Sequence, residues 1–373
     1  MLNEDLKGKK VVVGMSGGVD SAVAALLLKA HGCKVVGLHM KSANDENAND
    51  DAEMVRKLCN NLKIEYHIEE YSNEMQFVKD YFFHEYSIGR TPNPCVVCNK
   101  FVKFKPFIEF AERIGADYFA TGHYANICHD GGVHVLMKAR DENKDQSYFL
   151  NQLSQKQLER AIFVLGDLEK SEVREIAEKY NLISAHKKDS FDVCFVGSKK
   201  FKDFISEKCP QAGGDIINID NGNVVGKHTG IMKYTIGQRK GLGIGGSKDG
   251  TGEGWFVVGK NIKDNIVYVS QGDGELLLSD ALIANKFNWI PETPKEKEFV
   301  CKAKFRYRQP DQDVKVKIQD DGSVFVEFLQ KQRAVTTGQY VVLYQKANEN
   351  EFDRCLGGGQ IDAVIKNGKI LDL

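Results

Sequence analysis

The segment 11–21, which reads V-V-V-G-M-S-G-G-V-D-S, constrains the fold more than any other part of the chain. An apolar run leads through a glycine-rich turn into a helix-forming stretch, and the adjacent glycines let backbone amides turn toward an anion. The free N–H groups and the dipole of a helix N-terminus add attraction for phosphate. Ser16 and Ser21 offer hydroxyl groups, and the Asp20 carboxylate suits a magnesium ion held on the phosphates. The segment therefore predicts a phosphate-binding loop.

The first half of the chain alternates between strand and helix patterns. Apolar runs predict strands at 9–13, 34–39, 64–68 and 118–121. Helical periodicity and termination signals predict helices at 21–30, 51–62, 73–87, 103–113 and 172–180. The acidic, Asn-rich stretch 41–50 is predicted to be a mobile loop. Alternating strands and helices predict an α/β domain with a mostly parallel sheet and helices on both of its faces.

The pattern changes twice in the second half, which predicts two further domains. A Pro- and Gly-containing linker is expected at 209–214, and the stretch 221–248 carries five Lys/Arg and no Asp or Glu. A second boundary is expected at 289–294, and the region beyond it alternates apolar and polar residues around a D-G turn, as a small antiparallel β-barrel does. We therefore expect three domains, at 1–208, 209–288 and 289–373.

Overall charge and cysteine usage exclude some simple interpretations. The 51 Lys+Arg and 52 Asp+Glu residues leave a net charge of −1, so the total gives no sign of a nucleic-acid partner. Nine cysteines cannot form a complete disulfide framework, because the number is odd. The chain shows no signal peptide and no apolar run near the roughly 18 residues of a membrane helix. A cytoplasmic protein with reduced thiols and no membrane association is expected.

The predicted loop matches neither of two common nucleotide-binding motifs. It lacks the lysine of a Walker loop and the spacing of G-x-G-x-x-G. It resembles instead the S-G-G-x-D-S signature of the ATP pyrophosphatases, enzymes that cleave ATP between the α and β phosphates to adenylate a substrate. Met40 ends the second predicted strand and T-G-H at 121–123 follows another, which places both at the sheet edge where ligands bind in such folds.

Three of the nine cysteines lie in distinctive surroundings. Cys95 and Cys98 belong to R-T-P-N-P-C-V-V-C-N-K, where nearby cations could lower thiol pKa values: Arg90, Lys100 and Lys103. Cys194 lies in K-K-D-S-F-D-V-C-F-V-G. A zinc ribbon would need a second C-x-x-C or paired histidines. A thioredoxin-like pair would leave the phosphate loop unexplained. The third interpretation is a nucleophile in the C-x-x-C loop with a distant partner thiol.

The two cysteine motifs, together with Y-T-I-G-Q-R-K-G-L-G at 234–243, F-R-Y-R-Q at 305–309 and T-G-Q at 337–339, resemble the family of bacterial tRNA-specific 2-thiouridylases. The resemblance covers essentially the whole chain. It implies an N-terminal domain like that of the adenine-nucleotide alpha-hydrolases, a small central mostly-β domain and a C-terminal antiparallel β-barrel, with the last two contacting tRNA. It also implies ATP-dependent 2-thiolation of the wobble uridine (position 34), with release of AMP and pyrophosphate.

Site residues are carried over from this resemblance by position. Cys98 matches the nucleophile, and Cys194 matches the persulfide carrier that forms a transient disulfide with it. The positions implied to bind ATP are Gly14, Met15, Ser16, Gly17, Gly18, Val19, Asp20, Ser21, Met40 and Gly122. Those of the target-base loop are Asn93, Pro94 and Cys95. Those implied to contact tRNA are His123, Lys144, Asp145, Gln146, Tyr307, Arg308 and Gln339. The implied partners are the anticodon stem-loop of tRNA and a persulfide donor, either a relay protein or a cysteine desulfurase.

One position departs from the family pattern, in which the loop reads N-P-D-x-x-C. Cys95 replaces that aspartate, so Cys95, Cys98 and Cys194 could together hold a [4Fe–4S] cluster with one open iron. The alternative hypothesis is therefore the same reaction with a cluster as sulfur carrier. Two rival functions are a synthetase that adenylates a small molecule, for which no glutaminase-like segment is visible, and a non-enzymatic RNA-binding protein. The intact phosphate loop disfavours the second.

Overall fold

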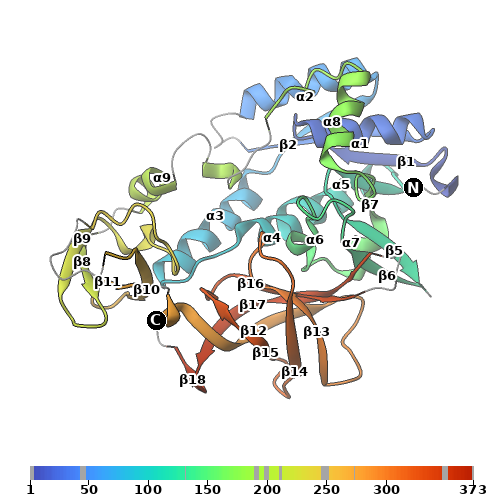
Figure 1. The fold of residues 1–373 in the computed structure, drawn as a ribbon. Helices are drawn as coiled ribbons and strands as arrows, with labels where there is room; N and C mark the ends of the chain where they lie inside the picture. Colours follow the sequence, from blue (N-terminus) through green and yellow to red (C-terminus); the bar gives the residue numbers. More distant parts are fainter. Residues whose placement is uncertain are drawn as a thin grey trace.

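A computed structural model describes residues 4–42, 48–130, 132–188, 193–196, 201–209, 212–244, 252–272, 274–346 and 352–371. Parts of four sequence features lie outside the described residues: 43–47 of the expected mobile loop, 210–211 of the expected linker, 245–248 of the basic stretch 221–248, and 189–192 with 197 around Cys194. Figure 1 shows the α/β domain packed over a β-barrel, with a smaller β-sheet to one side.

The N-terminal domain contains the predicted parallel sheet. Its strands are β1 (Lys10–Gly14), β2 (Lys34–Lys41), β3 (Glu65–Glu70), β4 (Tyr118–Thr121) and β7 (Ala161–Phe163). They lie in the order β3-β2-β1-β4-β7, and each neighbouring pair is parallel. The central strand β1 is apolar throughout its middle, where Val11, Val12 and Val13 are fully buried. Burial on both sides is what a parallel sheet covered by helices on both faces requires.

Helices cover both faces of this sheet, as predicted. On one face, α1 (Val19–Ala30), α2 (Ala48–Leu62) and α8 (Lys170–Lys179) pack over Val11 and Val13. On the other face, α5 (Lys105–Arg113) packs over Val12 and Phe119, and the same core takes in Tyr340, Val342 and Tyr344 of the barrel. Because successive β1 side chains point to opposite faces, one strand serves two cores. The second core joins the α/β domain to the barrel.

A long helical segment runs across the top of the barrel. It consists of α4 (Pro94–Cys98), a π-helical turn η2 (Asn99–Phe104) and α5, and it follows α3 (Ser72–Ser87). The predicted helix 103–113 is therefore the second half of a longer segment. The remaining short elements of this domain are η1 (Glu4–Leu6), α6 (Ser147–Leu150), α7 (Gln155–Arg160) and η3 (Cys194–Val196).

A hairpin that the sequence analysis did not predict connects the first and last domains. Strands β5 (Asn126–Asp130) and β6 (Val133–Met137) pair antiparallel, and Met137 of β6 pairs with Arg354 of the barrel strand β17. The hairpin thus extends the barrel sheet rather than the parallel sheet.

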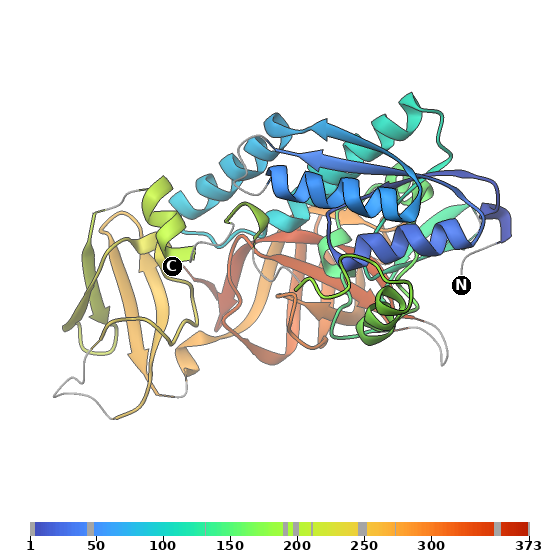
Figure 2. The ribbon, with the colours of Figure 1, turned by 90° about the horizontal axis from the view of Figure 1, so that it is seen from above.

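The central domain is a small sheet in the order β10-β11-β8-β9. Its elements are α9 (Phe201–Lys208), β8 (Gly214–Asn218), β9 (Val224–His228), η4 (Ile231–Lys233), β10 (Trp255–Asn261) and β11 (Ile266–Gln271). Its core includes Phe82 and Tyr86 of α3 and Val196 beside Cys194. The central domain therefore packs on the C-terminal half of α3, which both views show (Figures 1 and 2).

The C-terminal domain is a closed antiparallel barrel, as predicted. Its strands are β12 (Leu278–Trp289), β13 (Glu298–Lys304), β14 (Gln312–Ile318), β15 (Val324–Arg333), β16 (Tyr340–Gln345) and β17 (Arg354–Lys366), with η5 (Glu275–Leu277) before them and β18 (Lys369–Ile370) after. Pairing of β12 with both β15 and β17 closes the ring. Since β12 begins at residue 278, the barrel takes in residues before the expected second boundary. Among the described residues, no helix is both long and apolar enough to cross a bilayer.

Candidate active site

The phosphate loop lies at the carboxyl end of β1 and is held open by its own hydrogen bonds. The Ser16 N–H donates to Ser21 Oγ at 3.2 Å, and the Gly18 N–H donates to Ser16 Oγ at 3.3 Å. Ser21 Oγ in turn donates to the Gly18 carbonyl at 3.2 Å. Gly17 has φ +75°, a conformation that favours glycine. The loop therefore has its turn preformed in front of the α1 N-terminus, as anion binding requires.

Close packing also fixes the surroundings of the loop. A Cβ atom on Gly14 would lie 2.4 Å from Phe107 Cζ, so a side chain at this end of β1 would displace α5. A Cβ atom on Gly122 would lie 2.8 Å from both the Asp20 carbonyl carbon and the Ser21 nitrogen. The turn after β4 therefore packs directly on the first turn of α1. Both glycines act through close approach of their backbone, since neither has a positive φ.

Two lysines that the sequence analysis did not assign lie beside the loop. Lys170 Nζ donates to Asp20 Oδ1 at 2.5 Å, and the same oxygen accepts from the Tyr124 hydroxyl at 2.8 Å. Lys187 Nζ pairs with Asp51 Oδ1 at 3.0 Å and lies 3.6 Å from the position of a Cβ atom on Gly17. Two lysine ammonium groups therefore lie beside the loop, one from α8 and one from residue 187, and each is paired with a carboxylate.

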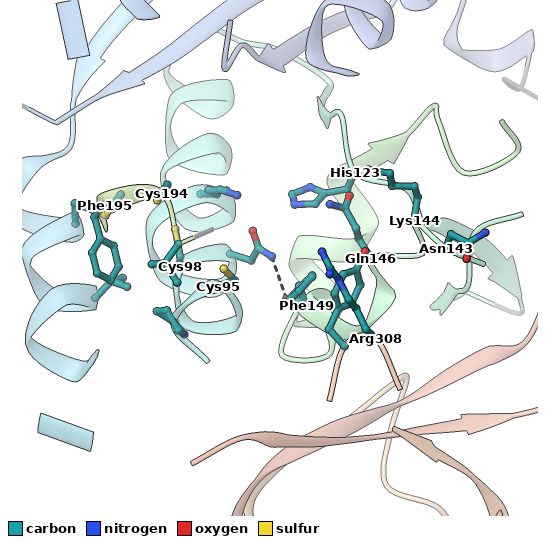
Figure 3. Close-up of a pocket in the computed structure, with 17 residues that line it drawn as sticks. Cys95, Cys98, His123, Asn143, Lys144, Gln146, Phe149, Cys194, Phe195 and Arg308 are labelled. Atoms are coloured by element: carbon teal, nitrogen blue, oxygen red, sulfur yellow. Dashed lines mark hydrogen bonds between the residues drawn. The ribbon is translucent and has the colours of Figure 1, made fainter. Parts of the chain in front are cut away.

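A cavity of about 810 Å³ lies at the same end of the sheet (Figure 3). It is bordered by α3, α4, η2, the turn after β4, the α6 region and residues 307–308 of the barrel. The residues that line it are Met75, Val78, Pro94, Cys95, Cys98, Asn99, Lys103, His123, Asn143, Lys144, Gln146, Phe149, Val193, Cys194, Phe195, Tyr307 and Arg308. Nine of the sequence-derived candidates are among them.

The three singled-out cysteines meet on one side of this cavity. Pro94 begins α4 and places Cys95 and Cys98 on its inner side, and η3 brings in Cys194 (Figure 3). Cys98 is buried and Cys194 is exposed, and none of the three forms a disulfide. Burial raises the pKa of the Cys98 thiol to about 12, while Lys103 opposes the shift and Cys194 and Cys95 add to it. Cys194 also raises the pKa of Cys95, and these effects between the thiols agree with their shared cavity.

Basic, amide and aromatic groups form the opposite side (Figure 3). Burial, and then Lys103, holds the pKa of His123 well below its usual range, so its imidazole is neutral at physiological pH. His123 Nδ1 lies 2.7 Å from Thr121 Oγ1. The rings of Phe149 and Tyr307 lie with centroids 4.4 Å apart. Lys144 and Arg308 add positive charge. This side could receive a planar base and an anionic backbone.

Other candidate residues lie behind the cavity wall. Asp145 is buried, and its Oδ1 accepts from the Ala139 and Ser147 N–H groups at 3.0 and 3.2 Å. Gln339 Nε2 donates to the Thr91 and Pro92 carbonyls at 2.8 and 3.3 Å.

Asn93 is also buried and interacts with the Tyr148 hydroxyl. Met40 packs between the core under the sheet and the small core around Cys98. In this structure Asp145, Gln339 and Asn93 hold the segments that carry the lining residues.

The cluster hypothesis requires three thiols arranged as one ligand set. Among the described residues, no group of three or more His, Cys, Asp or Glu side chains is arranged to hold a metal ion. Cys95, Cys98 and Cys194 share a cavity, but they do not form such a set. The arrangement fits an iron–sulfur cluster poorly, and no reaction step below passes through one.

The fold and the site together define a class: a nucleotide-binding α/β domain of the ATP pyrophosphatase type, joined to two β domains around a cavity lined with thiols. Three family models match in order, described as a tRNA methyl transferase HUP domain (residues 9–198), a tRNA methyl transferase PRC-barrel domain (202–271) and an aminomethyltransferase beta-barrel domain (279–361).

Full-length relatives give the family. The tRNA-specific 2-thiouridylase MnmA of Oceanobacillus iheyensis is 50% identical over 375 residues, covering 98% of each chain. That of Bacillus mycoides is 49% identical over 371 residues, covering 97% of each. The chain belongs to the tRNA-specific 2-thiouridylase family.

A solved structure, the U34-tRNA thiolase NcsA from Methanococcus maripaludis with its [4Fe-4S] cluster, overlaps 55% of this chain and 66% of its own, with 22% identity and a TM-score of 0.36. That likeness is too limited to inform the site.

Proposed function

We propose that this chain catalyses the ATP-dependent 2-thiolation of the wobble uridine of tRNA, with release of AMP and pyrophosphate. One observation carries the proposal: the phosphate loop and the thiol cavity adjoin. Gly122 packs on the start of α1, and the next residue, His123, lines the cavity that contains the three thiols. An activated oxygen and a sulfur donor can therefore meet within one site.

The chemistry explains why a nucleotide and thiols are needed together. The C2 carbonyl of uridine is a poor electrophile, and its oxygen is a poor leaving group. Attack of that oxygen on the α-phosphorus of ATP joins it to AMP and expels pyrophosphate, with loss of the N3 proton. The phosphate loop would hold the triphosphate, and Mg²⁺ bound to the phosphates would supply charge neutralisation when present. Gly14 to Ser21, Met40 and Gly122 are proposed to bind the nucleotide.

The charge of Lys170 beside Asp20 makes a testable contribution to ATP binding. Replacing Lys170 with methionine would leave the Asp20 carboxylate facing the triphosphate without its 2.5 Å partner. We expect the KM for ATP to rise roughly tenfold or more, which corresponds to about 1.4 kcal/mol. The measurement is AMP formation as a function of ATP concentration. Lys179→Met, on the exposed end of the same helix, is the matched control; equal KM values in the two variants would contradict the role of Lys170.

Sulfur transfer then uses two cysteines. The outer sulfur of a Cys194 persulfide attacks C2, and AMP leaves, which joins C2 to Cys194 through two sulfurs. The Cys98 thiolate attacks Cys194 Sγ, so a Cys98–Cys194 disulfide forms while the S–S electron pair and a proton at N3 complete 2-thiouridine. A thiol reductant must reduce the disulfide before the next turnover. The exposure of Cys194 supports sulfur delivery by an external persulfide donor, which we propose to be a relay protein or a cysteine desulfurase.

The cavity supports the entry of a flipped base. Moving the wobble uridine out of the anticodon stack costs a few kcal/mol of free energy, which stacking and hydrogen bonds in the cavity must offset. Phe149 and Tyr307 supply aromatic faces at the cavity, and the Pro94–Cys95 side supplies the facing wall. Lys144, Arg308, His123 and Gln146 are proposed to contact tRNA there. Asn93, Asp145 and Gln339 are proposed to support this region from behind.

Removal of Lys144 or Arg308 should weaken tRNA binding in a salt-dependent way. Both are cations at a cavity that would meet an RNA backbone. For Lys144→Ala and Arg308→Ala we expect about a tenfold increase in tRNA Kd and a fall of about 1 in the slope of log K against log salt. Binding titrations at several salt concentrations measure both. Lys297→Ala, which removes an exposed partner of Asp320 on the barrel, should change neither. Unchanged slopes for the cavity variants would contradict the assignment.

The descriptions of two matched models refer to methyl transfer, whereas the full-length relatives are named for thiolation. Three thiols beside a phosphate loop fit activation by ATP followed by sulfur transfer. A methyl transfer reaction would need neither pyrophosphate release nor a second cysteine.

The proposed function is tested by a complete reaction. Protein is incubated with ATP, Mg²⁺, unmodified tRNA and a persulfide donor, and AMP, pyrophosphate and 2-thiouridine are quantified. We expect the three products in equal amounts, including in protein shown to be free of iron. AMP formation without thiolated nucleoside would overturn the proposal, and loss of thiolation alone on iron removal would favour the cluster as sulfur carrier.

A further inference from the structure

Lys103 lies in a π-helical turn that begins directly after Cys98. The turn spans Asn99–Phe104, between α4 and α5. Five residues on a regular α-helix correspond to about 140° around the axis, which would turn residue 103 away from residue 98. A π-turn bonds residues five apart and returns the side chain to nearly the same side. Cys98 and Lys103 both line the cavity, in agreement with this geometry. Such insertions are frequent at functional sites.

Lys103 differs from the other cations of its segment. Arg90 pairs with Glu85 and with Asp362. Lys100 Nζ points to Gln152 Oε1 at 3.4 Å and lies over the Phe101 ring. Lys103 lines the thiol cavity and, within the part of the chain that the structure describes, forms no ion pair with a carboxylate. Its charge is therefore directed to the cavity rather than neutralised by an acid.

The electrostatics of the cavity agree with this placement. Lys103 lowers the pKa of Cys98 and of Cys95 against the opposing effect of burial, and it lowers the pKa of His123. The other titratable or charged groups that line the cavity with Cys98 are the thiols Cys95 and Cys194, the neutral imidazole of His123, and, across the cavity, Lys144, Tyr307 and Arg308. Burial raises the pKa of the Tyr307 phenol to about 12, so it is neutral as well. The wall from α3 contributes only apolar side chains, Met75 and Val78.

We propose that Lys103 activates Cys98, by stabilising the thiolate that attacks Cys194 Sγ and breaks the S–S bond to the transferred sulfur. This rests on the proposed function for the identity of the attacked bond. Lys103 acts through Cys98, because its ammonium offsets part of the burial that favours the thiol. In the step itself, one electron pair passes from the Cys98 sulfur into the new disulfide, and the pair of the old S–S bond passes onto the sulfur bound to C2. Without that charge, an even smaller fraction of the buried thiol would be ionised at neutral pH.

The test measures Cys98 directly, independently of thiolation. Full-length protein is alkylated with neutral iodoacetamide from pH 6 to 10, and labelling of Cys98 is read by peptide mass spectrometry, since the thiolate is the reactive form. For Lys103→Gln and Lys103→Met we expect at least tenfold slower labelling at pH 7.5 and a profile displaced by at least one pH unit to higher pH. Lys103→Arg should stay within about threefold of the parent.

Controls separate this effect from unfolding and from failure of the proposed function. Lys100→Gln removes the neighbouring lysine that faces Gln152, and its profile should not move. Cys301 is buried in β13, so its labelling in the same samples reports unfolding. If Cys301 is labelled in one of the two neutral variants, Lys103→Gln or Lys103→Met, the other variant is used for the comparison. Unchanged Cys98 profiles in a folded neutral variant, or an equal displacement in Lys100→Gln, would overturn the proposal. Absence of 2-thiouridine in the parent protein would overturn only the function.

Discussion

Replacing Cys98 with serine is expected to lower 2-thiouridine formation at least about a thousandfold while leaving pyrophosphate release in place. Adenylation uses the phosphate loop, which Cys98 does not touch. Thiolation would stop after the persulfide has attacked C2, because a serine hydroxyl is a poor nucleophile toward sulfur and no thiol remains to break the S–S bond. We expect tRNA to accumulate in a covalent, thiol-reducible link to Cys194. Denaturing gels without reductant and nucleoside mass spectrometry measure the two outcomes.

Two other serine variants sharpen this experiment. Cys128→Ser changes an exposed thiol outside the cavity and should leave all products unchanged. Cys95→Ser separates the two sulfur-carrier hypotheses, since a persulfide mechanism needs only Cys98 and Cys194. We expect it to retain thiolation within about tenfold of the parent. Full thiolation by Cys98→Ser in the absence of added thiols would contradict its assigned role.

Replacing Gly122 with valine is expected to reduce pyrophosphate release at least about a hundredfold. Even the Cβ atom would lie 2.8 Å from backbone atoms of Asp20 and Ser21, a distance that real Cβ contacts do not reach. The first turn of α1 would have to move, and the hydrogen bonds that shape the phosphate loop would move with it. Overpacking of this kind also costs about 1–3 kcal/mol of folding stability. tRNA-dependent pyrophosphate release and thermal unfolding measure the two effects.

Gly226→Ala is the matched control, because a Cβ atom there has its nearest neighbours at 3.6 Å, an ordinary contact. It should lose little stability and no activity. Gly122→Ala, with the smallest possible side chain, should fall between the parent and the valine variant. A folded Gly122→Val protein with normal pyrophosphate release would show that the turn after β4 does not hold the loop in place.

Local patterns in the sequence predict the parts of the fold that local interactions determine. The V-V-V-G-M-S-G-G-V-D-S segment is such a case, since strand, turn and helix signals follow one another directly. Alternation around Asp321-Gly322 likewise predicts the β14–β15 hairpin, whose buried side chains include Val314, Val316, Val324 and Val326.

Features that depend on distant partners were not predictable in this way. The β5–β6 hairpin contains an Asp-Gly-Gly turn signal, yet its docking on β17 depends on a strand more than 200 residues later. The hydrogen bond from Lys170 to Asp20 links α8 to α1, and no sequence spacing predicts this contact. Lys103 was visible as a nearby cation, but only the π-turn distinguishes it from Lys100 and Arg90.

The near-zero net charge illustrates the same limit. A net charge of −1 says nothing about where the cations lie, and the structure places Lys103, Lys144 and Arg308 around one cavity. Conversely, several lysines of the barrel are neutralised by carboxylates, as in the pairs Lys302–Asp313 and Lys317–Glu298. Local pairing, which the sequence does not reveal, decides which charges remain for a polyanionic partner.

The path of the sulfur atom tests the account most directly. Protein carrying an isotopically labelled persulfide on Cys194 is given ATP and unmodified tRNA for a single turnover without reductant, and nucleosides and peptides are analysed by mass spectrometry. We predict that the label appears in 2-thiouridine at the wobble position and that one Cys98–Cys194 disulfide forms for each labelled nucleoside. Retention of the label on the protein, or labelled nucleoside formed while Cys98 remains a free thiol, would contradict the account.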